Sequence, residues 1–413
     1  MPAKLYPRTM LALLTAINFF NYIDRSVLFA VQPLVQAEFR RNDAEFGFLT
    51  TAFFVCYMVA APIIAVFADR YPRKLIVVTG IVLWSGATLL TAVTHDFSTL
   101  LFRHTLVGIG EASYAAIAPA LIADLFPEHR RGRMLAIFYI AIPTGTAIGY
   151  MLGGYLGQLY GWRTPFYVAA VPGFLLAAGL MFLGEPKRGA NDHLLQTPER
   201  TTLVGLTRNP AFWSATLGMA MMTFALGGAS VWIPTFLSRV RGVPLQSANL
   251  FFGASTAFNG IVATLFGGWL GDRLLRRTDS AYYFISGLGM ILALPAMCVA
   301  IYSRGNAMFV GIVIAEFFLF LSTGPLNAAL VDSVAAPIRA TAIAVNLITI
   351  HLLGDAFSPV LMGYISDRNG LQAAFFAPLV TIVVSGAILF YGMRFAPSLR
   401  SENRGTSAAE AQA

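Results

Sequence analysis

Residues 65–74 read AVFADRYPRK, and residues 268–277 read GWLGDRLLRR. In both segments an aspartate and an arginine follow an apolar run, and two further basic residues come three and four positions after that arginine. Asp69 and Asp272 are 203 residues apart, about half of the 413-residue chain. A motif repeated at that distance predicts two structurally similar halves.

The composition indicates that lipid surrounds much of the chain. Hydrophobic residues make up 57% of the sequence, charged residues 12%, and the mean hydropathy is +0.68. A soluble domain cannot bury so much apolar surface. Apolar runs of about 20 residues, each long enough to cross a bilayer as a helix, occur twelve times. The predicted spans are residues 9–36, 44–67, 74–95, 98–125, 134–160, 163–184, 210–237, 247–270, 280–302, 306–333, 338–365 and 371–394.

We therefore expect an all-α membrane protein with twelve transmembrane helices in two pseudo-symmetric six-helix bundles. The longest polar stretch, residues 185–209, is predicted to be a cytoplasmic linker. It separates an N-terminal bundle, residues 1–184, from a C-terminal bundle, residues 210–395. Residues 396–413 are expected to form a disordered cytoplasmic tail.

The basic residues predict how the chain is oriented. If the N-terminus is cytoplasmic, 19 Lys and Arg residues fall on the cytoplasmic side of this span map and 7 on the outer side. The positive-inside rule therefore places both termini in the cytoplasm.

Several other functional classes are not supported. The net charge is +8, but the basic residues are scattered over short loops, so no nucleic-acid partner is expected. Cys56 and Cys298 lie in separate apolar runs in opposite halves, which gives no disulfide or metal-binding pattern. No nucleophile–base pair or cofactor motif indicates an enzyme or receptor. We expect no metal ion and no cofactor.

The repeated acidic and basic loops suit a gate at the cytoplasmic helix ends. An aspartate beside arginines can pair with a neighbouring helix in one state and release it in another, at little cost once the charges are hydrated. The candidate gating residues are Asp69, Arg70, Arg73, Lys74, Asp272 and Arg273. This loop after the second span, with a weaker copy after the eighth, resembles the major facilitator superfamily.

Longer segments resemble the spinster family within that superfamily. They are NYIDR at residues 21–25, VGIGEASY at 107–114, the region from Ala118-Pro119 to Asp124-Leu125-Phe126-Pro127, IFYIAIP at 137–143, and HLLGD at 351–355 with Ser358-Pro359. The resemblance implies the major facilitator fold and alternating access. It also implies transport of lysophospholipids or sphingosine-phosphate-like lipids coupled to protons, by a monomer in a bacterial inner membrane. The alternative is a carrier of small organic anions, sugars or drugs.

Ionisable side chains inside spans are costly and usually face a cavity or one another. The candidates for substrate binding and proton coupling are Asp24, Arg25, Arg103, His104, Glu111, Glu316, His351 and Asp355. Glu111 and Glu316 are 205 residues apart, near the offset of the repeat, and both are expected near the midplane. His351 and Asp355 are four residues apart and predict a polar pair on one helix face.

Asp24 is the leading candidate for proton coupling. At 1.5 Å per residue it lies at the same depth as Arg103 and His104, about 8 Å below the outer face. Spinster relatives usually have an arginine seven residues before the glutamate of the glycine segment, and here that position is His104. Either Arg103 reaches round the helix, or Asp24 pairs with His104, since a histidine partner would titrate near neutral pH where an arginine could not. Arg25 either joins this group or extends to the outer headgroups.

The orientation is testable by labelling in cells. In a variant without Cys56 and Cys298, Asn191→Cys should react with a membrane-impermeant maleimide only after permeabilisation, because the linker is predicted to be cytoplasmic. Arg241→Cys, in a predicted outer loop, should react in intact cells. Labelling of position 191 from outside would contradict the orientation.

Overall fold

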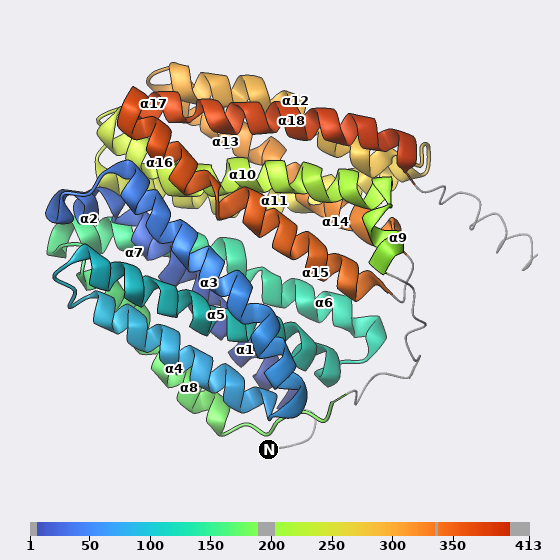
Figure 1. Ribbon diagram of the computed structural model, residues 1–413, viewed down its shortest axis with the longest axis horizontal. Helices are drawn as coiled ribbons and strands as arrows, with labels where there is room; N and C mark the ends of the chain where they lie inside the picture. The colour runs from blue at the N-terminus through green and yellow to red at the C-terminus, as the bar shows by residue number, and fades with distance from the viewer. Residues whose placement is uncertain (1–5, 189–202, 335–337, 397–413) are drawn as a thin grey trace, which may run out of the picture. The chain divides into compact units, whose positions relative to one another are not determined.

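The computed structural model describes residues 6–188, 203–334 and 338–396, and within these ranges all regular secondary structure is helical (Figure 1). This confirms the all-α prediction. The predicted tail beyond Ala396 lies outside the described residues, and so do residues 189–202 of the predicted linker.

The helices follow the predicted spans closely. The first eight are α1 (Tyr6–Ala30), α2 (Gln32–Phe39), α3 (Asp43–Arg70), α4 (Arg73–Thr91), α5 (Phe97–Leu125), α6 (Glu128–Tyr139), α7 (Ala141–Tyr160) and α8 (Thr164–Met181). The later ones are α9 (Leu203–Thr207), α10 (Pro210–Arg239), α11 (Leu245–Leu275), α12 (Ala281–Tyr302), α13 (Asn306–Leu321), α14 (Thr323–Asp332), α15 (Arg339–Ile350), η2 (His351–Asp355), α16 (Ser358–Asn369), α17 (Leu371–Ala374), α18 (Phe376–Gly392) and η3 (Met393–Phe395).

Among the described residues, 11 helical segments are long and apolar enough to cross a membrane. The one remaining predicted span, the first, corresponds to α1, which has 25 residues and is also long enough. Its mean hydropathy is lowered by polar residues that include Asn18, Asn21, Asp24 and Arg25. A helix that carries charges at membrane depth needs partners for them, which the neighbouring helices supply below.

Five predicted spans are not continuous helices, among them the twelfth, which breaks at Phe375 between α17 and α18. The first breaks at Val31, where Pro33 follows within the first turn of α2 and cannot donate a backbone hydrogen bond. The fifth breaks at Ile140 and the tenth at Ser322. The eleventh contains a π-helical turn, His351–Asp355, in which Gly354 has φ −101° and ψ −107°. Hydrophobic periodicity did not predict these breaks, because both sides of each break are apolar.

The chain divides into two compact units. The first comprises residues 1–196, 228–257 and 359–374, and the second comprises residues 197–227, 258–358 and 375–413. This division differs from the predicted bundles, because parts of α10, α11 and α16 group with the N-terminal helices. The separation into bundles 1–184 and 210–395 stays a prediction.

In the first unit, α1 packs on α7, both α3 and α4 pack on α5, and α4 packs on α8 (Figure 1). We call the end of this unit where α1 begins and α3 ends the Tyr6 end, and the end where α3 begins the Asp43 end. At the Asp43 end, Arg163 donates to both carboxylate oxygens of Glu38, at 2.6 and 2.8 Å. The hydrogen bond from Arg163 is the main cause that lowers the pKa of the Glu38 carboxyl.

The parts of α10, α11 and α16 that belong to the first unit are held by direct contacts. The Tyr150 hydroxyl donates to the Ser230 carbonyl at 2.5 Å, and the Asn249 amide donates to the Ala30 carbonyl at 3.0 Å. Gly47 of α3 lies so close to the backbone of Pro359 that an added Cβ would overlap it. The Asp43 end is therefore closely packed.

In the second unit, α12 packs on α13 and α18. The Tyr283 hydroxyl donates to the Ala211 carbonyl at 2.7 Å, and the Ser385 hydroxyl donates to the Gly218 carbonyl at 2.8 Å. These bonds satisfy buried hydroxyl groups between helices, where no water is available to replace them.

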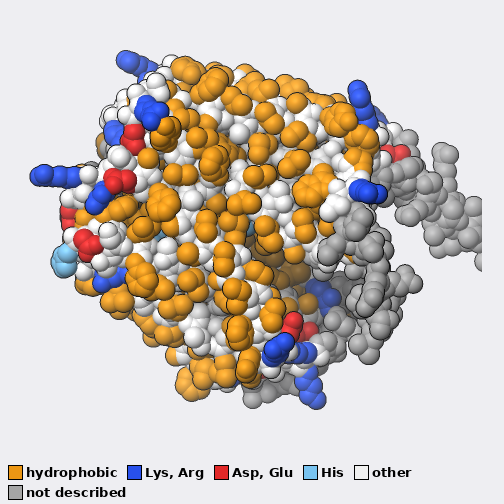
Figure 2. Space-filling view, in the orientation of Figure 1, with side chains coloured by type: hydrophobic (Ala, Val, Ile, Leu, Met, Phe, Trp, Pro, Cys, Tyr) orange, Lys and Arg blue, Asp and Glu red, His pale blue; other side chains and the backbone are white. Residues whose placement is uncertain are grey.

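Figure 2 shows hydrophobic side chains over most of the visible face, whereas Lys, Arg, Asp and Glu gather toward the helix ends. The exposed apolar residues include Val59 (58% exposed), Phe67 (51%) and Leu265 (70%). Such a surface suits contact with lipid.

The close packing at Gly47 is testable by substitution. Gly47→Ala should lower the free energy of unfolding by about 1–3 kcal/mol, because the added methyl group meets backbone atoms that cannot turn away. Gly86→Ala is the matched control, since an added Cβ there meets nothing within 4 Å. It should instead stabilise α4 by about 0.5–1 kcal/mol. Thermal unfolding in detergent measures both, and equal effects at the two positions would contradict this packing.

Candidate substrate and coupling site

An ion pair lies in the interior of the first unit, between α1 and α5. The guanidinium of Arg25 donates to Glu111 Oε2 from Nη2 at 2.5 Å and from Nε at 3.2 Å. Glu111 is the middle residue of α5 and its side chain is 1% exposed, while that of Arg25 is 15% exposed. Two opposite charges in such a place stabilise each other, and each would be costly alone.

Aromatic rings surround the cation of this pair. The guanidinium carbon of Arg25 lies 4.9 Å from the ring centre of Tyr22, 5.0 Å from Phe53, 5.6 Å from Phe54 and 5.8 Å from Tyr57. Ring faces attract a cation most strongly where water is excluded. We call these four residues the aromatic cage. Arg25 therefore joins the buried group and does not extend to the end of the helices.

The neighbouring carboxylate, Asp24, has a different partner. It is buried, and its Oδ2 accepts a hydrogen bond from the Thr88 hydroxyl of α4 at 2.5 Å. Asp24 and Arg25 are consecutive on α1, so they point about 100° apart around the helix. One turn of α1 thus presents an acid to α4 and a cation to α5.

The expected pairing of Asp24 with Arg103 or His104 is not among the described contacts of the first unit. His104 is buried and stacks on Phe53, with ring centres 5.1 Å apart. Arg103 points toward the end of α4, where it donates to the Thr94 hydroxyl at 2.7 Å and to the Leu90 carbonyl. Both side chains of α5 thus have partners other than Asp24.

Glu316 lies in the second unit, on α13, and is 3% exposed. Asn259 Nδ2 of α11 lies 3.4 Å from Glu316 Oε2 and 3.1 Å from the Val313 carbonyl. Glu111 and Glu316 thus share a position in the sequence repeat, but one contacts a cation and the other an amide.

The predicted pair His351–Asp355 is present in the second unit. The Nδ1 of His351 lies 2.9 and 3.1 Å from the two carboxylate oxygens of Asp355. The pair occupies the π-helical turn. Gly227 of α10 packs so closely against Asp355 that a side chain at position 227 would overlap it. Among the described residues no three His, Cys, Asp or Glu side chains are grouped to hold a metal ion.

The first predicted gating loop is tied to the segment after α8. Arg73 forms ion pairs with Asp124 at 2.6 Å and with Glu185 at 3.4 Å. Glu185 also accepts hydrogen bonds from the backbone amides of Arg73 and Lys74, at 3.0 and 3.2 Å. Glu185 thereby caps the start of α4, where backbone amides lack helical partners.

Two cations at this loop are held by backbone carbonyl groups. Lys74 Nζ donates to the carbonyls of Met181 and Leu183 at the end of α8, at 3.1 and 2.9 Å. Arg188 donates to the carbonyls of Ala68, Asp69 and Tyr71 at the end of α3. The sequence did not single out Asp124, Glu185 or Arg188 as contacts of this loop.

The second predicted gating loop has other contacts. Asp272 accepts a hydrogen bond from the Tyr282 hydroxyl at 2.8 Å, and the guanidinium of Arg273 lies 5.7 Å from the ring centre of Trp269. The two loops share a sequence pattern, but the residues around them differ.

A further polar cluster at the Asp43 end was missed by the sequence analysis. The buried carboxylate of Asp43 accepts hydrogen bonds from both terminal nitrogens of Arg239, from the Ser366 hydroxyl at 2.5 Å and from Gln36 at 2.8 Å. Asp367 accepts from the backbone amides of Asp43 and Ala44, at 2.8 and 2.9 Å. We call Gln36, Asp43, Arg239, Ser366 and Asp367 the Asp43 cluster. All five lie near predicted span ends, where charged residues are ordinary, so no sequence signal marked them.

Comparison with known proteins identifies the family. A sequence model of the Major Facilitator Superfamily matches residues 14–354. Protein spinster homolog 1 of Xenopus laevis is 34% identical over 384 residues, which cover 87% of this chain and 73% of the relative. The chain belongs to the spinster family of the major facilitator superfamily. Another spinster-family relative, the Sphingosine-1-phosphate transporter SPNS2 of Danio rerio, is 37% identical over 378 residues, 85% of this chain and 74% of the relative.

Solved spinster structures have the same fold. A bacterial homologue of the human lysosomal transporter spinster, in an inward-facing and unoccupied conformation, matches with a TM-score of 0.86 and 26% identity over 95% of this chain and 98% of that chain. The inward-facing and occupied conformation matches with a TM-score of 0.83 over 94% and 97%. The chain is thus a multi-pass membrane transporter with the major facilitator fold, and the spinster resemblance is confirmed.

The Asp43 cluster of this spinster-family transporter is testable by neutralising its carboxylate. Asp43→Asn should cost about 1–2 kcal/mol of stability, since Arg239 loses its counter-ion but is 41% exposed and partly screened. It should also speed maleimide labelling of a cysteine at position 50, in a Thr50→Cys variant without Cys56 and Cys298. Thr50 is buried two turns further along the same face of α3, so its labelling reports whether this end opens.

The matched control is Glu45→Gln, which neutralises an exposed pair with Arg41 in the same first turn of α3. It should leave the labelling rate unchanged. An unchanged rate in Asp43→Asn would show that the cluster does not hold this end closed.

Proposed function

We propose that this chain is a secondary transporter that works by alternating access and moves lysophospholipids or related amphipathic lipids with a phosphate headgroup, coupled to protons. The observation that carries the proposal is the buried ion pair of Arg25 and Glu111 inside the aromatic cage. The relative named as a sphingosine-1-phosphate transporter supports a substrate that joins a phosphate to a long apolar chain.

Arg25 is the proposed partner of the phosphate. A guanidinium binds phosphate and carboxylate with the same paired geometry, so a phosphate can compete with Glu111 for it. The side chain of Arg25 is more exposed than that of Glu111, 15% against 1%, so an incoming headgroup meets the cation first. The surrounding rings offer apolar contact to the part of the lipid beside its headgroup.

Glu111 and Asp24 are the proposed proton-coupling residues. When a phosphate occupies Arg25, Glu111 loses its counter-ion in a place without water, and binding a proton removes that buried charge. Asp24 is one residue from Arg25, and its hydrogen-bond partner, the Thr88 hydroxyl, is neutral. Binding a proton would therefore remove a buried charge at Asp24 as well. Binding of a phosphate to Arg25 is thus accompanied by binding of a proton to Glu111, which links the two movements.

The two ends of the first unit are the proposed gates. The excess of basic residues supports a cytoplasmic Tyr6 end and cytoplasmic termini. The similarity to a bacterial spinster homologue supports a bacterial inner membrane. The loop of Asp69, Arg70, Arg73 and Lys74 lies at that end, and the Asp43 cluster closes the opposite end. Alternating access requires the Asp43 cluster to break when the site opens outward.

The proposed coupling is testable with purified protein in vesicles. Asp24→Asn should abolish lysophospholipid uptake driven by a pH gradient but spare part of the binding, because Arg25 and Glu111 remain. Asp96→Asn is the matched control: Asp96 is an exposed helix cap, and asparagine caps a helix equally well.

Glu111→Gln should weaken both binding and uptake, because the amide neither neutralises Arg25 nor exchanges a proton. Unaltered gradient-driven uptake by Asp24→Asn would remove Asp24 from the mechanism. Uptake of short-chain sugars or organic acids without lysophospholipid uptake would establish the small-solute alternative instead.

A further inference from the structure

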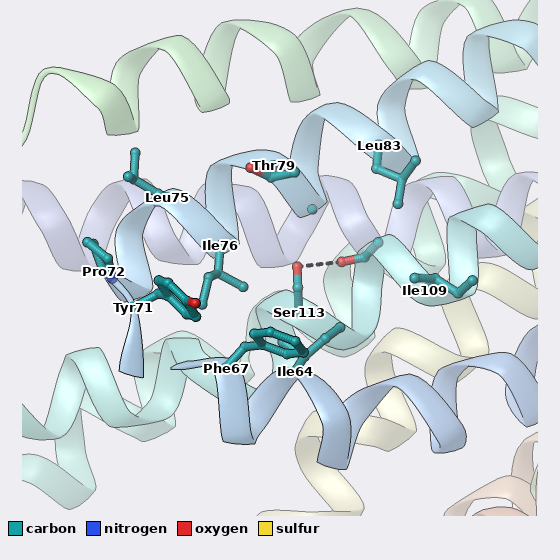
Figure 3. Close-up of a pocket in the computed structure, with 12 residues that line it drawn as sticks. Ile64, Phe67, Tyr71, Pro72, Leu75, Ile76, Thr79, Leu83, Ile109 and Ser113 are labelled. Atoms are coloured by element: carbon teal, nitrogen blue, oxygen red, sulfur yellow. Dashed lines mark hydrogen bonds between the residues drawn. The ribbon is translucent and has the colours of Figure 1, made fainter. Parts of the chain in front are cut away.

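An apolar groove on the first unit is not used by the proposed transport site. Its walls are α3 and α4, and its floor is α5 (Figure 3). Both wall helices pack extensively on α5 but hardly on each other, which leaves a cavity of about 490 Å³ between them. The lining is almost entirely apolar and includes Phe67, Tyr71, Leu75, Ile76, Leu83 and Ile109.

The groove continues along α3 into a second apolar cavity of about 400 Å³, which shares Ile64 and Ile109 with the first. Together they extend from Val55 to Tyr71, about 24 Å along the helix. One leaflet of the hydrocarbon core is about 15 Å thick. The groove is therefore long enough for an acyl chain that lies along α3.

The floor of the groove is fixed and offers no polar partner. Gly80 of α4 and Gly110 of α5 approach so closely that a Cβ on either would overlap the other helix. The Ser113 hydroxyl beside them donates to the Gly110 carbonyl at 2.7 Å (Figure 3). Because this hydroxyl is satisfied within α5, the floor suits hydrocarbon.

The Tyr6 end of the groove is closed by the loop from α3 to α4 and has an excess of positive charge. Arg70 at the end of α3 is exposed, and so is the neighbouring carboxylate of Asp69, so four cations (Arg70, Arg73, Lys74 and Arg188) stand against three carboxylates (Asp69, Asp124 and Glu185). Lys74 and Arg188 are held by backbone carbonyls, which do not neutralise them as carboxylates would. Arg73 contributes less, because Asp124 and Glu185 pair with it. An anionic headgroup at this end meets complementary charge.

The groove is separate from the aromatic cage. None of its lining residues is Tyr22, Phe53, Phe54 or Tyr57, the four rings around Arg25. Between the two, α3 contacts α5 directly, since a Cβ on Gly108 would overlap the Phe53 backbone. A lipid in the groove does not reach Arg25.

We propose that this groove binds one acyl chain of an anionic phospholipid of the bilayer, whose phosphate lies beside Arg70, Lys74 and Arg188. The occupant is a resident lipid and not the transported one. It joins α3, α4 and the loop between them on the side away from the transport site.

Native mass spectrometry of the purified transporter tests the proposal by titration with phosphatidylglycerol or phosphatidylcholine of identical acyl chains. The wild type should retain phosphatidylglycerol more strongly than phosphatidylcholine. Thr79→Trp fills the groove and should reduce bound phosphatidylglycerol to the background level. Its matched control, Val82→Trp, adds the same side chain to an exposed position of α4 outside the groove and should retain the lipid.

Arg70→Gln should remove the preference for phosphatidylglycerol, whereas Arg133→Gln, the same change at an exposed position of α6, should keep it. Equal retention by Thr79→Trp and Val82→Trp would overturn the groove as the binding site. A lipid that is lost in Glu111→Gln, or displaced by lysophospholipid, would be the substrate and not a resident lipid. Because the readout is bound lipid, the result does not depend on which solute the protein transports.

Discussion

The cost of a charge inside hydrocarbon is the constraint around which the first unit is organised. Removing an ion from water costs several kcal/mol even after the protein relaxes. Arg25 and Glu111 offset that cost by pairing at 2.5 Å, and the aromatic cage holds the cation in place. The pair joins α1 to α5, and Asp24 reaches Thr88 of α4 from the preceding position on α1. A site that depends on one ion pair is also sensitive to any ligand that competes for it.

The backbone groups at the helix ends also need polar partners where water is scarce. Terminal amides and carbonyls have no helical partners, and side chains supply them. At the Tyr6 end Glu185 receives the amides that begin α4, and Arg188 donates to the carbonyls that end α3. At the Asp43 end Asp367 receives the amides that begin α3. These contacts join segments far apart in the chain, so movement at either end must break several of these hydrogen bonds at once.

The two halves share a sequence pattern more than they share contacts. Asp69 and Asp272 follow equivalent spans, yet the first loop is tied by Arg73 and Glu185 and the second by the Tyr282 hydroxyl. Glu111 contacts a guanidinium, whereas Glu316 contacts an amide. The first unit thus holds a buried guanidinium beside its glutamate, which supports headgroup recognition there.

The sequence by itself determined the helical class, the positions of the spans and the residues that carry charge inside them, because span length and composition are local properties. It also determined the pair of His351 and Asp355, since residues four apart share a helix face. Only the tertiary structure decided which charges meet. Arg25 and Glu111 are 86 residues apart, and Asp43 and Arg239 are 196 apart. Their contact depends on the rotation and depth of each helix against its neighbours, which close approaches such as Gly47 with Pro359 and Gly108 with Phe53 set. Depth alone, estimated from the chain, predicted that Asp24 and His104 could meet, but rotation turned His104 toward Phe53.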